Sequence, residues 1–153
     1  EELDVSIIKV GSCSIDDWPL LEEISDINKK IIISTAGADF RTLHRVYDLF
    51  KNKHRDFAFM HCVGEYPTPI EKSNLNRIQM LQDEFHDIEV GFSTHESPDE
   101  DSLVPFAVSM GCTIIEKHVG VPTDEISLNQ YHLQCNHNNM VRERLYRNLP
   151  LHS

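Results

Sequence analysis

The sequence lacks a long hydrophobic run and carries few basic residues. Its 153 residues include 14 Lys and Arg against 25 Asp and Glu, a formal net charge of −11. This charge repels polyanions at long range, which argues against a nucleic-acid or anionic-membrane partner. No stretch approaches the roughly 20 apolar residues of a membrane span, and the opening EELDVSIIKV has neither the basic start nor the apolar core of a signal peptide. These absences predict a soluble, cytoplasmic protein with no nucleic-acid or membrane partner.

Cysteine is also sparse, and its spacing excludes two kinds of site. The 4 cysteines lie far apart and form no CxxC pair, so neither a zinc knuckle nor a redox dithiol is encoded. A chain of 153 residues is long enough for one domain with a substantial core and too short for two comfortable ones. We therefore expect residues 1–153 to form a single domain.

Short apolar runs rich in β-branched residues alternate with amphipathic stretches along the chain. The runs predict strands, and the stretches between them repeat apolar residues every three or four positions, which is the helical period. Strands that alternate with single helices predict a parallel sheet with right-handed crossovers, so the fold class is α/β. We expect strands at 6–10, 30–34, 57–62, 88–93 and 112–118, and helices at 20–29, 40–53, 74–85, 99–110 and near 138–148.

Two architectures fit this alternation: an open doubly wound sheet, or part of an eight-stranded (β/α) barrel. Length favours the open sheet, because a complete barrel typically needs about 250 residues. The strand ends favour the barrel, because every run finishes in polar residues at the edge where parallel α/β folds bind ligands. An open sheet, by contrast, binds its ligands mainly at the one point where the strand order reverses. The polar residues at these ends are Lys9, Ser12, Ser34, Thr35, His61, Tyr66, Ser93, His95, Glu116, Lys117 and His118.

Two histidines, His95 and His118, end consecutive runs. Neighbouring parallel strands lie about 4.8 Å apart, so two imidazoles at adjacent strand ends can reach one metal ion. Glu116 stands two positions before His118 and points the same way on a strand. The residues alone leave other interpretations open: the histidines could pack or bond to backbone independently, Lys9 could be an edge lysine that reaches for water, and Tyr66 could be a packing residue.

Five consecutive motifs together resemble the strand ends of the N-acetylneuraminate (sialic acid) synthase family. They are KVGS, ISTAG, MHCVGEYPTP, VGFSTH and IIEKHV, and the HCxxxYPTP pattern is the most diagnostic. The resemblance implies a TIM-barrel-type (β/α)8 parent fold, of which this chain covers about five βα units, strands four to eight. It also implies that the first three strands and the family's small antifreeze-like domain are absent from this chain, and that the protein is a homodimer.

The function implied by the resemblance is the condensation of phosphoenolpyruvate with N-acetylmannosamine or a related N-acylated amino sugar. The products are a sialic acid-type nonulosonic acid and phosphate, and a divalent ion, Mn2+ or Mg2+, polarises the sugar aldehyde. His95 and His118 match the metal ligands, and Glu116 matches the residue that orients or deprotonates water. The catalytic residues are thus predicted to be Glu116, His95 and His118, and the substrate-binding residues Lys9, Ser12, Ser34, Thr35, Tyr66 and Ser93.

The sequence departs from the family pattern at three places. Thr94 stands where the family usually has an aspartate, and Gly64 where it often has asparagine or serine. The segment 121–134 replaces a glycine-proline-aspartate-histidine run, with Asn129 or Gln130 at the sugar-contacting place. These changes affect the sugar end of the site more than the phosphoenolpyruvate end, and they predict a divergent member.

Two other functions remain open from the sequence. The chain could be a non-catalytic sugar-phosphate or anion-binding module, or one half of a split barrel, because the family's first strands contribute an acidic residue and a lysine to the site. A flavodoxin-like signalling domain fits less well, because neither an early acidic cluster nor a Gly-rich phosphate loop follows the first run.

Overall fold

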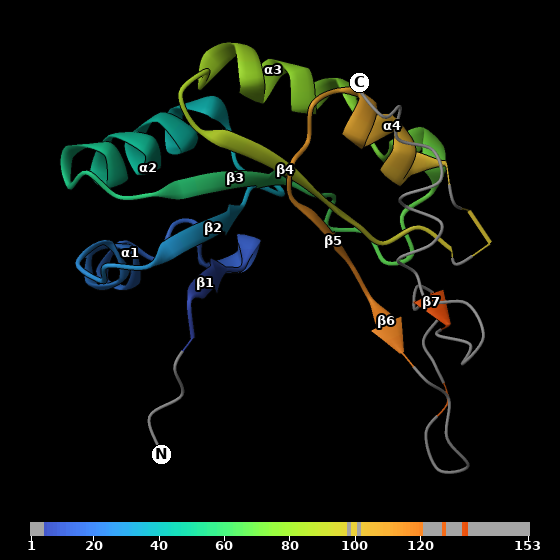
Figure 1. The fold of residues 1–153 in the computed structure, drawn as a ribbon, viewed down its shortest axis with the longest axis horizontal. Coiled ribbons are helices and arrows are strands. Elements are labelled where there is room, and N and C mark those ends of the chain that lie inside the picture. The colour runs from blue at the N-terminus through green and yellow to red at the C-terminus, as the bar shows by residue number, and fades with distance from the viewer. Residues whose placement is uncertain (1–4, 98, 101, 121–126, 128–132, 135–153) are drawn as a thin grey trace, which may run out of the picture.

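The chain folds into a parallel five-stranded sheet whose strands lie side by side in the order of the sequence (Figure 1). The computed structural model describes residues 5–97, 99–100, 102–120, 127 and 133–134. The sheet consists of β1 (Ile7–Val10), β2 (Lys30–Ser34), β3 (Phe57–His61), β4 (Glu89–Thr94) and β5 (Ile115–Lys117), and β6 (Val119–Gly120) pairs in parallel with β7 (Leu133–Gln134). The helices are α1 (Trp18–Ser25), α2 (Phe40–Asn52), α3 (Asn76–Glu84) and α4 (Leu103–Ser109), with 3-10 turns at Ser12–Ser14 and Ile70–Lys72.

The five predicted strands and the four helices between them are confirmed, with ends that differ by a few residues. Helix α1 begins before the predicted position because the Asp17 side chain accepts a hydrogen bond from the Leu20 N–H at 3.3 Å and Pro19 sits in the first turn. Asp39 caps α2 in the same way, accepting from the Thr42 N–H at 2.7 Å. The helix predicted near 138–148 lies outside the described residues. Among the helices that are described, none is long and apolar enough to cross a lipid bilayer.

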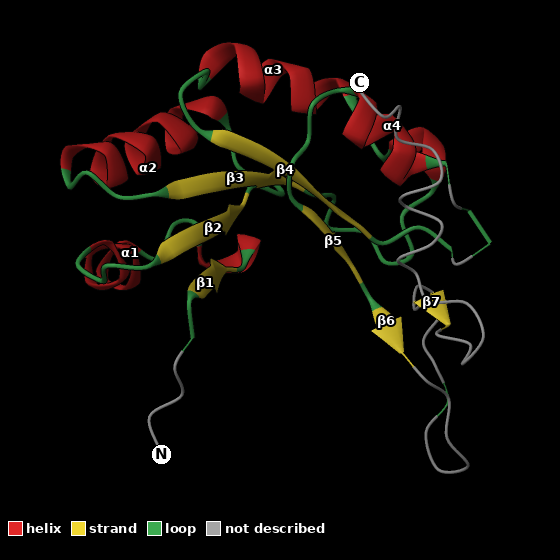
Figure 2. Ribbon diagram, in the orientation of Figure 1, coloured by secondary structure: helices red, strands yellow, loops and turns green. Residues whose placement is uncertain are grey.

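The arrangement of the helices decides between the two architectures. An open doubly wound sheet carries helices on both faces and reverses its strand order at a switch point. Here the order β1-β2-β3-β4-β5 never reverses, and α2, α3 and α4 all lie along the same side of the sheet (Figure 2). This is the arrangement of consecutive βα units in a (β/α) barrel, so the barrel-type α/β prediction is confirmed.

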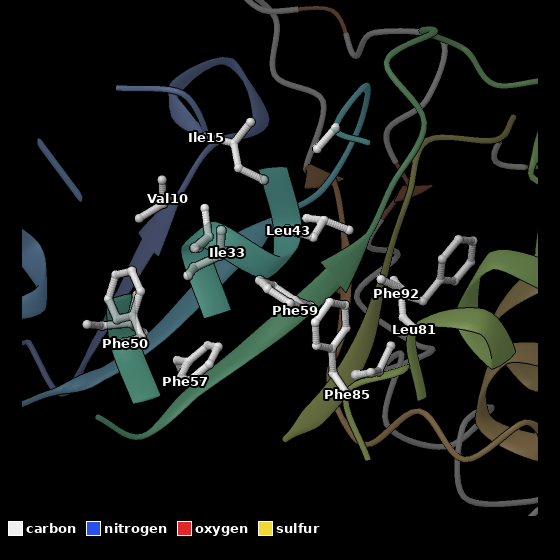
Figure 3. Close-up of a cluster of buried hydrophobic side chains, with 14 of the residues drawn as sticks. Val10, Ile15, Ile33, Leu43, Phe50, Phe57, Phe59, Leu81, Phe85 and Phe92 are labelled. Atoms are coloured by element: carbon white, nitrogen blue, oxygen red, sulfur yellow. The ribbon is translucent and has the colours of Figure 1, made fainter. Parts of the chain in front are cut away.

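The core lies between the sheet and these helices (Figure 3). Alternate strand residues point into it, as the two-residue period of a strand requires. Phe59 of β3 meets Phe85 after α3 edge to face, with ring centroids 5.1 Å apart, and Phe57 meets Phe50 of α2 at 5.4 Å. Each fully buried side chain of this size contributes roughly 1.5–3 kcal/mol to folding, so the helix-covered face supplies most of the stability.

The intervening strand residues lie on the opposite face, which carries the predicted site. Lys9, Ser93 and Glu116 belong to it. A glycine on this face, Gly91, allows β4 to lie close to its neighbours: a Cβ there would stand 2.7 Å from the carbonyl oxygen of Ile114 and 2.8 Å from the sulfur of Met60. Gly91 therefore sets the spacing of the sheet two residues before Ser93.

Candidate active site

Three predicted residues from three different strands are joined directly. The Lys9 ammonium of β1 donates to Oε1 of Glu116 in β5 at 2.5 Å, and the Ser93 hydroxyl of β4 donates to the same oxygen at 2.8 Å. The register of β4 and β5 places Ser93 opposite Glu116, so the second bond follows from strand pairing. Residues 107 positions apart in sequence, Lys9 and Glu116, thus meet on one face of the sheet.

This network controls the charge of Glu116. Burial raises the pKa of the Glu116 carboxyl, but the hydrogen bonds from Lys9 and Ser93 and the positive charge of Lys9 together hold it below its ordinary value. The carboxylate is therefore ionised at neutral pH. A lysine ammonium has three N–H donors, so the bond to Glu116 leaves donors on Lys9 that can bind an anion as well.

His95 and His118 follow β4 and β5 directly and come together as the sequence predicts. Their ring centroids are 5.2 Å apart with the planes inclined at 46°. Ser93 pairs with Glu116 and Thr94 with Lys117, so the two histidines are the next residues along the same register. His95 is 6% exposed, and His118 lies at the exposed rim.

The two imidazoles are the side chains of this site that could bind a divalent metal ion, as a pair of nitrogen ligands. Burial, reinforced by the neighbouring His118, lowers the pKa of His95 to about 4, so its ring is neutral at pH 7. Neutral imidazole is the form that binds metals. In the part of the chain that the structure describes, no group of three His, Cys, Asp or Glu side chains is placed to hold an ion. A metal held here would keep open positions for water and substrate, as catalytic metal sites do.

Tyr66 packs against the same histidine. Its ring meets His95 edge to face with centroids 4.2 Å apart. The loop after β3 is tied to the site by the Thr68 N–H, which donates to the His95 carbonyl at 2.9 Å, while the Thr68 hydroxyl donates to the Glu65 carbonyl at 2.6 Å. Tyr66 is 55% exposed, so it lines the rim of the site and also packs on His95.

The remaining predicted residues lie at the same strand ends but outside this network. The Thr35 hydroxyl donates to the Met60 carbonyl at 3.2 Å, and the Thr35 N–H donates to the same oxygen at 3.0 Å. Ser34 is buried, and Ser12 begins a 3-10 turn. Within the described residues, no hydrogen bond joins Ser12 or Ser34 to Lys9, Ser93 or Glu116. Their substrate-binding roles stay predictions.

His61, the third strand-end histidine, belongs to the packed side of the sheet. Its Nε2 is 2.8 Å from the Ser73 carbonyl, and its ring stacks on Phe92 with centroids 5.7 Å apart. Burial lowers the pKa of His61, so the ring is neutral and Nε2 is the donor to Ser73. This histidine fixes the segment after β3 and is 1% exposed.

An ion pair that the sequence interpretation missed lies next to both histidines. Lys117 donates to Oε1 of Glu96 at 2.6 Å, and the Glu96 side chain is completely buried. Glu96 follows His95, and Lys117 precedes His118. The sequence does show an acidic residue after His95 and a basic residue before His118. Only the β4–β5 register shows that these two residues are close enough to pair.

Comparison with known proteins identifies the family. Residues 1–134 match the NeuB family. The chain belongs to the NeuB family. This confirms the resemblance to sialic acid synthases that the strand-end motifs carry.

The NeuB relatives include proteins of polysaccharide and nonulosonic acid biosynthesis. The chain is 39% identical over 115 residues to the spore coat polysaccharide biosynthesis protein SpsE of Bacillus subtilis, covering 74% of this chain and 30% of that protein. It is 38% identical over 120 residues to the N,N'-diacetyllegionaminic acid synthase of Campylobacter jejuni, covering 76% of this chain and 35% of the synthase. The crystal structure of a spore coat polysaccharide biosynthesis protein E from Chromobacterium violaceum superposes with a TM-score of 0.83 at 42% identity, over 85% of this chain and 39% of that one.

The chain therefore spans about a third of the length of the curated relatives it matches. The described strands and the candidate site lie within residues 1–134, which match the NeuB family.

Proposed function

We propose that this NeuB-family chain carries the metal and phosphoenolpyruvate half of an active site that condenses phosphoenolpyruvate with an N-acylated amino sugar. The observation that carries the proposal is the convergence of Lys9, Ser93, Glu116, His95 and His118 at one edge of the sheet. A relative with 38% identity, the Campylobacter jejuni protein, is an N,N'-diacetyllegionaminic acid synthase, which favours a product of the sialic acid type.

Lys9 and Ser93 are suited to hold the phosphate and carboxylate of phosphoenolpyruvate. The net charge of the chain is −11, so an anionic substrate needs a local cation, and the Lys9 ammonium provides one on the site face. The serine hydroxyl can donate to an anion oxygen. Because Lys9 is bonded to Glu116 in this structure, a bound anion would share or replace that contact.

The reaction joins the third carbon of phosphoenolpyruvate to the sugar's aldehyde carbon. Water adds to the second carbon, and phosphate leaves from the resulting tetrahedral centre to give the ketone, so that phosphoenolpyruvate, sugar and water yield keto acid and phosphate. Glu116 is ionised and can accept the proton of that water. His95 and His118 would hold Mn2+ or Mg2+, which supplies Lewis-acid polarisation of the aldehyde when bound.

The position of Thr94 bears on the sugar. Thr94 pairs with Lys117 and is 3% exposed, and strand alternation places it on the face opposite Ser93 and His95. That placement argues against a direct contact between residue 94 and a sugar hydroxyl. The amino sugar is therefore proposed only as a class, N-acetylmannosamine or a related N-acylated sugar.

An assay of phosphate release tests the proposal. The chain is incubated with phosphoenolpyruvate, Mn2+ and a panel of amino sugars. A second sample also contains the part of the Campylobacter jejuni synthase to which this chain does not align. We expect phosphate release that requires both substrates and is lost in Glu116→Gln. Phosphate release from phosphoenolpyruvate without sugar, or activity unchanged in Glu116→Gln, would contradict the proposed reaction.

The same assay tests the second candidate, a non-catalytic anion-binding module or one half of a split barrel. Activity only in the mixture would show that catalysis needs strands supplied by the added part, as it would in a split barrel. No activity in either sample, together with phosphoenolpyruvate binding by the chain, would favour a non-catalytic anion-binding module. The single domain predicted from the sequence stays a prediction. The homodimer implied by the family resemblance stays one as well.

A further inference from the structure

The ion pair between Glu96 and Lys117 is the most buried of the salt bridges among the described residues. The Glu96 side chain is 0% exposed and that of Lys117 is 13% exposed. In the pair between Lys9 and Glu116, by contrast, the side chains are 38% and 33% exposed. A carboxylate taken entirely out of water is costly unless it is paired, so Glu96 depends on Lys117 for its place in the fold.

The pair connects the ends of the two strands that carry the histidines. Thr94 pairs with Lys117 in the β4–β5 register, and Glu96 lies two residues beyond Thr94. The bridge therefore crosses from one strand end to the other at the level of His95 and His118. Side chains alternate along β5, so Glu116 and His118 point to one face of the sheet and Lys117 to the other. The Lys117 end of the ion pair therefore lies on the face opposite His118.

A second contact holds the backbone of His95 from another direction. The Thr68 N–H donates to the His95 carbonyl at 2.9 Å. His95 thus has its carbonyl fixed by the loop after β3 and its next residue fixed by β5. His118 has the preceding residue fixed by the same ion pair. The two rings, with centroids 5.2 Å apart, thus extend from backbone positions that these contacts hold.

We propose that Glu96 and Lys117 are positioning residues that hold the His95 and His118 imidazoles at the spacing one divalent ion requires. The inference deepens the proposed function, because it rests on the histidine pair as the metal site. Lys117 points to the face opposite His118 and is bonded to Glu96, so the pair would act on the histidines through the backbone. A metal site depends on such supporting contacts to keep its ligands oriented.

The test compares three forms of the whole chain. Glu96→Gln/Lys117→Met removes both charges together, which leaves no unpaired buried charge and preserves folding better than either single change. Glu96→Lys/Lys117→Glu restores an ion pair with its sign reversed. Lys53→Met is the matched control, because it breaks the exposed Lys53–Asp26 pair, whose residues follow α2 and α1 and touch neither histidine. Far-UV circular dichroism and the urea midpoint confirm that each form is folded.

Two readouts follow, and the first needs no metal. In the metal-free chain we expect a nuclear Overhauser contact between the ring protons of His95 and His118, weakened in the neutral double variant and recovered in the reversed pair. In calorimetric titrations with Mn2+ we expect the dissociation constant of the neutral double variant to rise at least about 10-fold, the range typical for lost supporting contacts. Lys53→Met should leave both readouts unchanged.

The outcomes separate this inference from the proposed function. A folded neutral double variant with an unchanged ring contact would overturn the positioning role, as would a reversed pair that restores neither readout. Failure of the wild-type chain to bind Mn2+ would count against the proposed function, and the ring contact would then decide the positioning role by itself.

Discussion

Replacing Gly91 by alanine tests whether the close approach of β4 to its neighbours builds the site. The added Cβ would stand 2.7 Å from the Ile114 carbonyl oxygen and 2.9 Å from the Ile114 Cβ. The Met60 sulfur, at 2.8 Å, ends a flexible side chain and can move. The carbonyl cannot move freely, because it accepts the hydrogen bond of the Phe92 N–H at 2.9 Å.

The expected cost follows from that clash. Extra volume in a well-packed region typically lowers the free energy of unfolding by about 1–3 kcal/mol. For a chain of this size each kcal/mol corresponds to roughly 2–4 °C, so Gly91→Ala should lower Tm by about 2–12 °C. Because Gly91 lies two residues before Ser93, the strand shift should also lengthen the bond between Ser93 and Glu116.

Thermal and urea unfolding, followed by circular dichroism, measure the stability change. Gly64→Ala is the matched control, because a Cβ at Gly64 meets nothing within 4 Å. Without a clash, a glycine-to-alanine change is neutral or stabilises by up to about 1 kcal/mol. A Tm of Gly91→Ala equal to the wild type, or an equal loss in Gly64→Ala, would refute the spacing argument.

Three further predictions concern charged groups. Lys9→Met should raise the pKa of Glu116, because it removes a hydrogen bond and a positive charge that lower it; carboxyl NMR titration would show an unchanged pKa if the contact were absent in solution. Burial lowers the pKa of His61 from its ordinary 6.5, so the unfolded chain takes up a proton first and stability should fall as the pH drops below about 6.5. His61→Gln should flatten that decline in urea titrations, and an identical slope would contradict it. Lys117→Met should cost about 3–5 kcal/mol in urea unfolding because it leaves the Glu96 carboxylate buried and unpaired, while adding Glu96→Gln should recover most of the loss; equal losses would argue against the buried charge.

The sheet was predictable because its strands are short apolar runs separated by helical periodicity. Residues such as Ile31 and Ile33 are buried on the helix side, while the strand ends carry the polar residues. Helix starts were less predictable, although Asp17 and Asp39 are capping residues whose role can be seen in the sequence afterwards. The choice between open sheet and barrel needed the helices placed on one side of the sheet, which periodicity does not specify.

The candidate site was predictable to the extent that strand ends meet at one edge. That rule brings His95 to His118 and Ser93 to Glu116. It does not say that Lys9 crosses to Glu116, because that contact depends on the curvature of the sheet between β1 and β5. It also does not reveal that Thr35 bonds to the Met60 carbonyl, since a polar residue at a strand end can face a substrate or the backbone.

Calorimetric titration with Mn2+, in the presence and absence of phosphoenolpyruvate, tests the central claim most directly. The samples are the wild-type chain, His95→Ala/His118→Ala and the control His44→Ala/His86→Ala, which removes two exposed imidazoles elsewhere. We predict one Mn2+ site in the wild type and the control, tightened by phosphoenolpyruvate and lost in the His95/His118 variant. Equal binding in all three proteins, or no binding in any, would contradict a metal site between the two strand-end histidines.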